Sequence, residues 1–174
     1  WQPRRPVDLI FSNAALQWLG HHETLFPKMM TWLVKGGVLA VQMPNNWQQP
    51  SHQILADVVN DGPWTKTLKP HLRLAPVMAM DEYEKILKPP GAKGRGVKVR
   101  VFEKVYEHKL EGENAVAQWL KGTTLGVLMD RLPNDQAANF WQQYCERVAV
   151  AYPADKEGKT LFPFHRIFII AQKN

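Results

Sequence analysis

The sequence contains one cysteine and no long apolar stretch, and each of these scarcities limits what the protein can be. Cys145 is the single cysteine among 174 residues, so no internal disulfide can form and a reducing compartment is expected. No uncharged apolar run is long enough to cross a membrane, and no charged-then-apolar leader opens the chain. We therefore expect a cytoplasmic protein without a membrane partner.

Recognisable catalytic and metal-binding motifs are also missing. Cys145 has no neighbouring base and shares helical spacing with Trp141 and Val148, so we expect it in the core. The segment 21–23, His-His-Glu, lacks the spacing of a zinc-binding HExxH helix. An apolar stripe follows it, and we interpret it as the start of a helix. The sequence thus predicts no catalytic side chain and no metal site.

Positive charge is unevenly distributed along the chain. There are 22 Lys and Arg against 16 Asp and Glu, a formal net charge of +6. Much of the excess lies in residues 85–109, where the glycine-rich segment 91–96 has no interleaved aromatic residues to stack on bases. We interpret this stretch as a solvated loop and strand edge, with an anion-attracting rim as the alternative. No nucleic-acid partner is expected.

A strand, a polar loop, a helix and a second strand are predicted near the start of the chain. The apolar run 7–11 leads into segment 12–18, and apolar spacing predicts a helix from about His22 to Val34. Gly36 or Gly37 is expected to end that helix. The aliphatic run 38–41 does not alternate with polar residues, which is typical of a parallel strand covered on both faces.

The remaining elements are predicted from caps and periodicity. Ser51 is interpreted as the N-cap of a helix that extends to Val59, and a short helix is expected near residues 81–87. Residues 97–106 alternate and predict a strand with one solvated face, and the apolar run 162–171 is expected to pair with it in an antiparallel way. Two helices, starting near residues 114 and 134, are expected between these strands.

Several segments resemble methyltransferases. Residues 8–18 and 36–46 resemble strand-end segments of the class I methyltransferases that use S-adenosylmethionine. The segments Gln42-Met43-Pro44, Trp119–Thr123, Ala151-Tyr152-Pro153 and Arg166-Ile167-Phe168 are similar to the trans-aconitate methyltransferase family. The resemblance covers nearly the whole chain. It implies methyl transfer from S-adenosylmethionine to a carboxylate of a small organic acid similar to trans-aconitate.

The resemblance also implies a fold and its division into parts. We expect an α/β protein with a partial Rossmann-like class I methyltransferase core, an antiparallel closing pair of strands and an inserted helical cap. Residues 1–46 are assigned to the second half of the core and residues 47–96 to a cap or substrate lid. Residues 97–174 are assigned to the closing strands and helices of the same domain.

Two departures from the family pattern leave alternatives open. The family's glycine-rich first loop and the acidic residue after its second strand have no counterpart, so we expect an inactive fragment equivalent to the C-terminal two-thirds. Gly126 stands where the family has an arginine, the natural partner of a carboxylate. Another acceptor, such as a carrier-bound acyl group, therefore stays open, as does a non-catalytic binding or interaction module if the chain is complete. The strand at 7–11 would also leave a bare apolar edge, which predicts self-association.

Candidate site residues follow from the strand ends and from the family resemblance. A carboxylate acceptor is already ionised at neutral pH, so the protein must orient and anchor it rather than deprotonate it. For the cofactor the candidates are Asn13, Gln17 and Trp18. For the acid, Arg166 is the first candidate, because an arginine entering an apolar strand needs a partner. The others are Tyr152, Trp119, Lys121, Tyr83, His52 and Asn45. Competing interpretations remain for three of these candidates. Asn13 could simply form a turn, Trp18 could be a core residue, and Arg166 could form a structural salt bridge.

Overall fold

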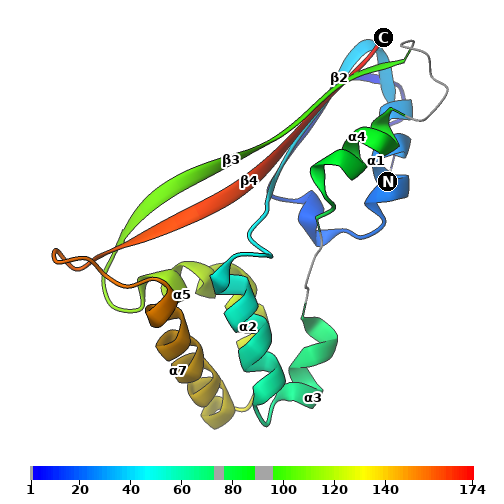
Figure 1. Cartoon of the computed structure of the whole chain (residues 1–174). Helices are drawn as coiled ribbons and strands as arrows, with labels where there is room; N and C mark the ends of the chain where they lie inside the picture. Colours follow the sequence, from blue (N-terminus) through cyan, green and yellow to red (C-terminus); the bar gives the residue numbers. More distant parts are fainter. Residues whose placement is uncertain (1, 73–76, 89–95) are drawn as a thin grey trace. The chain divides into compact units, whose positions relative to one another are not determined.

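The computed structural model describes residues 2–72, 77–88 and 96–174. The predicted glycine-rich segment lies, apart from Gly96, outside these residues. In chain order (Figure 1), the elements are β1 (Val7–Asn13), η1 (Leu16–Trp18), α1 (His22–Thr31), β2 (Leu33–Pro44), α2 (Pro50–Asp61), α3 (Thr65–Leu68), η2 (Lys69–His71), α4 (Met80–Leu87), β3 (Val97–Glu111), α5 (Ala115–Leu120), η3 (Lys121–Leu125), α6 (Gly126–Met129), α7 (Asn134–Ala151) and β4 (Lys159–Lys173).

The four strands form one mixed sheet in the order β1-β2-β4-β3. β1 pairs with β2 in parallel, and β2 pairs with β4 in an antiparallel way. Residue numbers rise along β3 as they fall along β4. The amide of Asn174 donates to the carbonyl of Gly96 at 2.9 Å, and the Phe102 ring stacks on Phe168 at 5.0 Å. The closing pair is therefore antiparallel, and the α/β fold class expected from the sequence is confirmed.

The first helix is shorter than its apolar spacing predicts. α1 ends at Thr31, because the chain then pairs with β1: the amide of Val7 donates to the carbonyl of Trp32 at 2.9 Å, and Leu33 pairs with Val7. The register shifts before the next pair, and Gly36 lies within this irregularity at a φ of 81°. Gly36 therefore lies within β2, where its positive φ accommodates the register shift. The prediction that it ends the helix is wrong.

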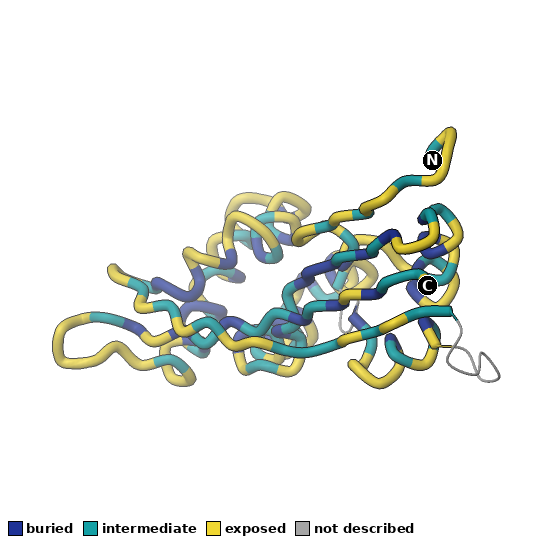
Figure 2. Tube along the Cα trace, turned by 90° about the horizontal axis from the view of Figure 1, so that it is seen from above, coloured by how far each residue is buried: buried dark blue, intermediate teal, exposed yellow. Residues whose placement is uncertain are grey.

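The prediction of strands covered on both faces is also wrong for the described structure. In β2, Leu39, Val41 and Met43 are buried, whereas Val38 and Ala40 between them are only half-buried. Leu9 and Phe11 of β1 are 57% and 71% exposed, and Figure 2 traces this alternation along the chain. Among the described residues, β1 is at the edge of the sheet.

A buried polar link joins α1 to α4, which pack against each other (Figure 1). Nε2 of His22 lies 2.9 Å from the carbonyl oxygen of Leu16, so this nitrogen must carry the proton. Nδ1 lies 2.6 Å from the hydroxyl of Tyr83. The amide of Met78 donates to the same hydroxyl at 3.2 Å. These contacts tie α4 to α1 and to the carbonyl of Leu16.

The chain divides into two compact units. The sheet unit comprises residues up to 45, the α4 segment with β3 up to 105, and residues 165–174. The helical unit comprises the α2–η2 region and residues 106–164. Residues 46–72 thus pack with the helices that follow β3, while α4 packs in the sheet unit. The assignment of residues 47–96 to a lid stays a prediction.

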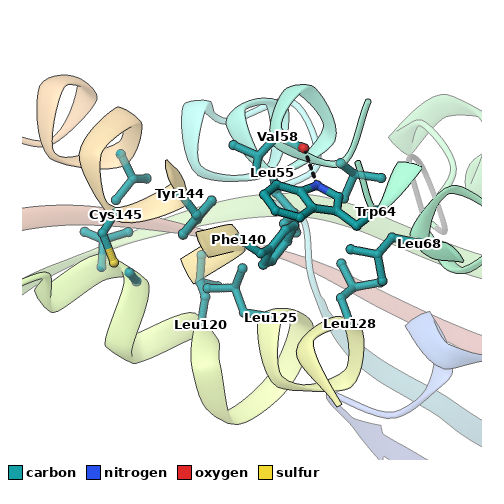
Figure 3. Packing of buried hydrophobic residues seen from close by; sticks show 14 of the residues in the cluster. Leu55, Val58, Trp64, Leu68, Leu120, Leu125, Leu128, Phe140, Tyr144 and Cys145 are labelled. Carbon is teal, nitrogen blue, oxygen red and sulfur yellow. Dashed lines mark hydrogen bonds between the residues drawn. The ribbon is translucent and has the colours of Figure 1, made fainter. Parts of the chain in front are cut away.

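A tryptophan organises the core of the helical unit. Trp64 is 1% exposed, donates to the carbonyl of Val58 at 2.7 Å and meets the edge of the Phe140 ring at 5.3 Å (Figure 3). Cys145 is buried in the same cluster, as predicted, and burial raises the pKa of its thiol to about 11. A thiol with such a pKa is protonated at neutral pH, which fits a packing role.

Two local details differ from the sequence interpretation. α2 begins with Pro50 at its first turn and Gln49 as the N-cap residue, so Ser51 lies inside the helix instead of capping it. η3 is a π-helical turn, and the amide of Gly126 donates to the carbonyl of Lys121 five residues earlier. A Cβ atom on Gly126 would overlap that carbonyl oxygen. Within the described ranges, no helix is long and apolar enough to span a membrane.

Candidate functional site

The loop after β1 is tied to the carboxyl end of β2. Asn13 pairs with Gln42, and the amide of Ala14 donates to the carbonyl of Gln42 at 3.0 Å. Ala14 has a φ of 51°, which turns the chain toward η1, and Nε2 of Gln17 donates back to the carbonyl of Ala14 at 2.8 Å. Of the three cofactor candidates, Asn13 and Trp18 are exposed and Gln17 is buried, so the structure places all three around this strand end.

β4 holds the end of β2 from the other side. Pro44 pairs with Arg166, and the amide of Asn45 donates to the carbonyl of His165 at 2.9 Å. Two of the acid-binding candidates, Arg166 and Asn45, therefore lie together at the carboxyl end of a buried strand. Ligands of α/β sheets bind at such an edge.

A carboxylate outside the predicted candidates organises this edge. Glu103 on β3 accepts from Nδ2 of Asn45 at 2.7 Å, and its other oxygen lies 2.9 Å from Nδ1 of His165. The side chains of His165 and Glu103 are 19% and 26% exposed. Glu103 is one of the few acidic residues in a basic stretch, which was the available signal. The three residues hold the loop after β2 to the sheet.

Arg166 is held by an amide from β2. Nη1 of Arg166 donates to Oε1 of Gln42 at 3.1 Å. Gln42 is 6% exposed, and its Nε2 is buried without a hydrogen-bond partner among the described residues. The buried hydroxyl of Ser12 on β1 also has no hydrogen-bond partner among the described residues. Ser12 pairs with Val41 and therefore projects from the face opposite to Gln42. Buried polar groups are nearly always satisfied in native structures, so the orphaned amide of Gln42 beside Arg166 indicates a place for a ligand.

In the helical unit, two further candidates meet at Ser51. The amide of Ser51 donates to the hydroxyl of Tyr152 at 3.3 Å, and Oγ of Ser51 lies 3.2 Å from Nδ1 of His52. The carbonyl of Ser51 accepts from the hydroxyl of Tyr144 at 3.0 Å. Burial lowers the pKa of His52 from 6.5 to about 4. His52 is therefore neutral at pH 7 and can offer an acid a hydrogen bond but no charge.

Trp119 and Tyr152 share a group of rings, and Lys121 lies over another. Trp119 is 40% exposed and lies 6.2 Å from the Phe162 ring, which in turn lies 5.5 Å from Tyr152. Nζ of Lys121 is 5.0 Å from the centre of the Trp141 ring. The exposed face of Trp119 is the part of this group that an external molecule can reach.

Tyr83 has a different environment from the other candidates. It is fully buried, and its hydroxyl interacts with His22 and Met78. Burial raises the pKa of this hydroxyl to about 12. These contacts join α4 to α1 and leave the hydroxyl inside the protein, where an acid substrate does not reach it without rearrangement.

Comparisons with known proteins identify relatives of the chain. No protein-family model matches the chain. The chain is 38% identical to trans-aconitate 2-methyltransferase of Variovorax paradoxus over 175 residues, which cover 99% of the chain and 66% of the relative. It is 37% identical to the Klebsiella pneumoniae protein of the same name, covering 99% and 64%. The chain is homologous to trans-aconitate 2-methyltransferases.

The homology has a defined extent. The chain spans less than two thirds of the length of these methyltransferase relatives. Among solved structures, the YcgJ protein of Bacillus subtilis superposes with a TM-score of 0.51 at 12% identity, covering 99% of the chain and 66% of that protein. At this identity the likeness concerns the fold alone. The family resemblance and the fold class expected from the sequence are thus confirmed.

Gly126 can now be interpreted for this trans-aconitate methyltransferase homologue. The family resemblance places an arginine at this position, and the π-helical turn of η3 leaves no room there for a Cβ atom. No side chain at position 126 can therefore contribute to acid binding in this backbone conformation.

Proposed function

We propose that the protein containing this chain transfers a methyl group from S-adenosylmethionine to a carboxylate of a small organic acid. The observation that carries the proposal is the position of Arg166. In a homologue of trans-aconitate 2-methyltransferases, this guanidinium lies beside the carboxyl end of β2, where Gln42 holds it. The fold binds ligands at that edge, and a guanidinium can bind a carboxylate through two parallel hydrogen bonds.

The residues of this edge would act by holding the acid. Arg166 would bind one carboxylate of the acid and thereby orient a second one as the acceptor. Asn45, fixed by Glu103, would contribute hydrogen-bonding groups of the loop after β2. His52, Trp119, Lys121 and Tyr152 of the helical unit stay candidates for contacts with the acid. The acceptor oxygen is ionised at neutral pH, so no residue of the chain needs to remove a proton.

Part of the cofactor's environment fits the residues at the end of β1. The buried hydroxyl of Ser12 has no partner among the described residues, Asn13 is exposed, and Trp18 offers a 42% exposed ring. Asn13, Gln17 and Trp18 would hold the polar and aromatic parts of S-adenosylmethionine. When bound, this cofactor supplies a methyl group on a positively charged sulfur, and transfer yields the methyl ester of the acid.

A second acceptor class is favoured by Gly126. Without an arginine at this position, the chain has one carboxylate-binding group fewer than the family resemblance implies. An acid with fewer carboxylates than trans-aconitate, including a carrier-bound acyl group with one free carboxylate, is the alternative acceptor.

The test is a methylation assay with the natural polypeptide that contains this chain. It would be incubated with methyl-labelled S-adenosylmethionine and, in parallel, trans-aconitate, a dicarboxylic acid, a monocarboxylic acid and a carrier-bound acyl group. We expect labelled methyl ester from an acid, and the preferred acid distinguishes the two acceptor classes. Labelled protein or nucleic acid, or no ester from any acid, would contradict the proposal.

Variants then test the role of Arg166. Arg166→Met should raise the KM for the acid about 10- to 100-fold, the usual effect of losing a hydrogen bond to a charged group, and Arg166→Lys should recover part of the loss. The matched control is Arg147→Met, because Arg147 is an exposed arginine that pairs with Asp61 at 2.7 Å in the helical unit. Equal effects of the two Met variants would show that Arg166 does not bind the acid.

A further inference from the structure

Gln42 has a local geometry that differs from the other polar residues of the sheet. Its carbonyl oxygen, Oε1, accepts from Nη1 of Arg166 at 3.1 Å. Because a guanidinium has donors only, this contact fixes which end of the Gln42 amide is oxygen and which is nitrogen. Nε2 is therefore a donor, and it is buried without a partner among the described residues.

The sheet register brings this donor and the guanidinium to one side. Pro44 pairs with Arg166 and Gln42 pairs with Phe168, so Gln42 and Arg166 project from the same face of adjacent strands. Phe168, the residue that pairs with Gln42, stacks on Phe102 at 5.0 Å on the same face. In such surroundings a hydrogen bond is stronger than in water, and a buried donor without an acceptor is costly.

We propose that Gln42 is a specificity-determining residue of the acid site and that it acts together with Arg166; this rests on the proposed methylation of an acid. Oε1 of Gln42 holds the guanidinium in place. A side-chain shift of Arg166 on acid binding exposes Nε2 of Gln42, which then donates to the carboxylate that Arg166 binds. The acid is thus recognised by a guanidinium and a neutral amide, and the ligand class is a small carboxylic acid.

The neutrality of Gln42 is part of the inference. At this contact an amide accepts from Arg166 without neutralising its charge, whereas a glutamate of the same shape would form an ion pair with it. A glutamate would also lack the donor and would repel the incoming carboxylate. The structure therefore distinguishes Gln42 from a residue that only fills space or only supports Arg166.

Two variants and one control test this role in the natural polypeptide. Gln42→Met keeps the length of the side chain and removes both hydrogen-bonding ends, and Gln42→Glu keeps the acceptor and adds charge. The control is Gln172→Glu, because Gln172 pairs with Val38 at the other end of the same face and its Nε2 donates to the carbonyl of Gly36 at 3.2 Å. The assays are KM for the acid, KM for S-adenosylmethionine, kcat, thermal unfolding, and calorimetric binding of the acid.

We expect the KM for the acid to rise about 10-fold in Gln42→Met, which loses the hydrogen bond to the carboxylate, and about 100-fold in Gln42→Glu, where the loss of that donor is joined by repulsion between two carboxylates. KM for S-adenosylmethionine and the control should stay unchanged. An unchanged KM for the acid in an active enzyme would overturn the inference, as would equal losses in every kinetic parameter together with a lower melting temperature. If the unmutated protein methylates no acid, the proposed function fails, and calorimetry with trans-aconitate still tests whether Gln42 contributes to anion binding.

Discussion

His52 gives the structure a stability that depends on pH. Its imidazole is buried between the Ser51 hydroxyl, 3.2 Å from Nδ1, and the Trp47 ring, whose centre lies 4.9 Å away. Burial disfavours the charged form and lowers the pKa of His52 from 6.5 to about 4. Between these two values the unfolded chain binds a proton that the folded chain does not bind. The contribution of neutral His52 to the free energy of unfolding is therefore fully present above pH 6.5 and is lost as the pH falls toward 4.

The size of this effect follows from the two pKa values. They differ by about 2.5, and one pKa unit corresponds to about 1.4 kcal/mol, so His52 alone should remove about 3 kcal/mol of stability by pH 4. That is a large part of the ~5–15 kcal/mol available to a typical domain. Protonated His52 would also have to sit beside apolar groups, which is why the loss should affect the helical unit first.

The assay is urea unfolding between pH 4 and 8, followed by tryptophan fluorescence, of the unmutated chain and of His52→Asn. Asparagine does not titrate and keeps a polar atom near Ser51, so the difference between the two proteins isolates His52 from the other histidines. His71→Asn is the matched control, because His71 is exposed. The free energy of unfolding of the unmutated chain minus that of His52→Asn should be constant above pH 6.5 and should fall by about 3 kcal/mol toward pH 4. A difference that stays flat, or an NMR titration of His52 near 6.5, would refute the reasoning.

Three further changes test the backbone, the core and the sheet edge. Gly126→Ala should convert or weaken the π-helical turn, because its Cβ would overlap the Lys121 carbonyl, and should lower the melting temperature; an unchanged melting temperature would contradict this. Trp64→Phe removes the 2.7 Å hydrogen bond to the Val58 carbonyl and should cost about 1–3 kcal/mol in denaturant unfolding; a neutral effect would show that water replaces the indole. Phe11 is 71% exposed on an edge strand, so the 174-residue chain should self-associate in light scattering and Phe11→Lys should reduce this; a monodisperse monomer before mutation would disprove it.

The sequence predicted most elements because their periodicity is local. The alternation in residues 97–106 and the apolar run at 162–171 both became strands, and the helix predicted from residue 134 is α7. The errors lie where a tertiary contact overrides local pattern. α1 ends early because Leu33 pairs with Val7, a partner that spacing within the helix cannot reveal. Ser51 has the residue type of a cap but is the second residue of α2, two positions after the N-cap Gln49.

The site shows the same division between residue type and partner. Arg166, Asn45 and Asn13 were selected because polar groups at strand ends and an arginine entering an apolar strand are visible in one dimension. Gln42 and Glu103 were not selected, because their importance comes from contacts over 124 and 58 residues. Such contacts depend on the register of three strands, and a single sequence carries no direct signal of register.

The sequence by itself determined the α/β class, the order of strands and helices along the chain, and the likeness to methyltransferases, since all three depend on residues close together in the chain. Only the tertiary structure decided that β4 lies between β2 and β3, that Arg166 is held by Gln42, and that position 126 has no room for a side chain. The physical reason is that hydrogen bonding and burial depend on which distant segments meet. Those meetings are set by the packing of the whole sheet and not by any one segment.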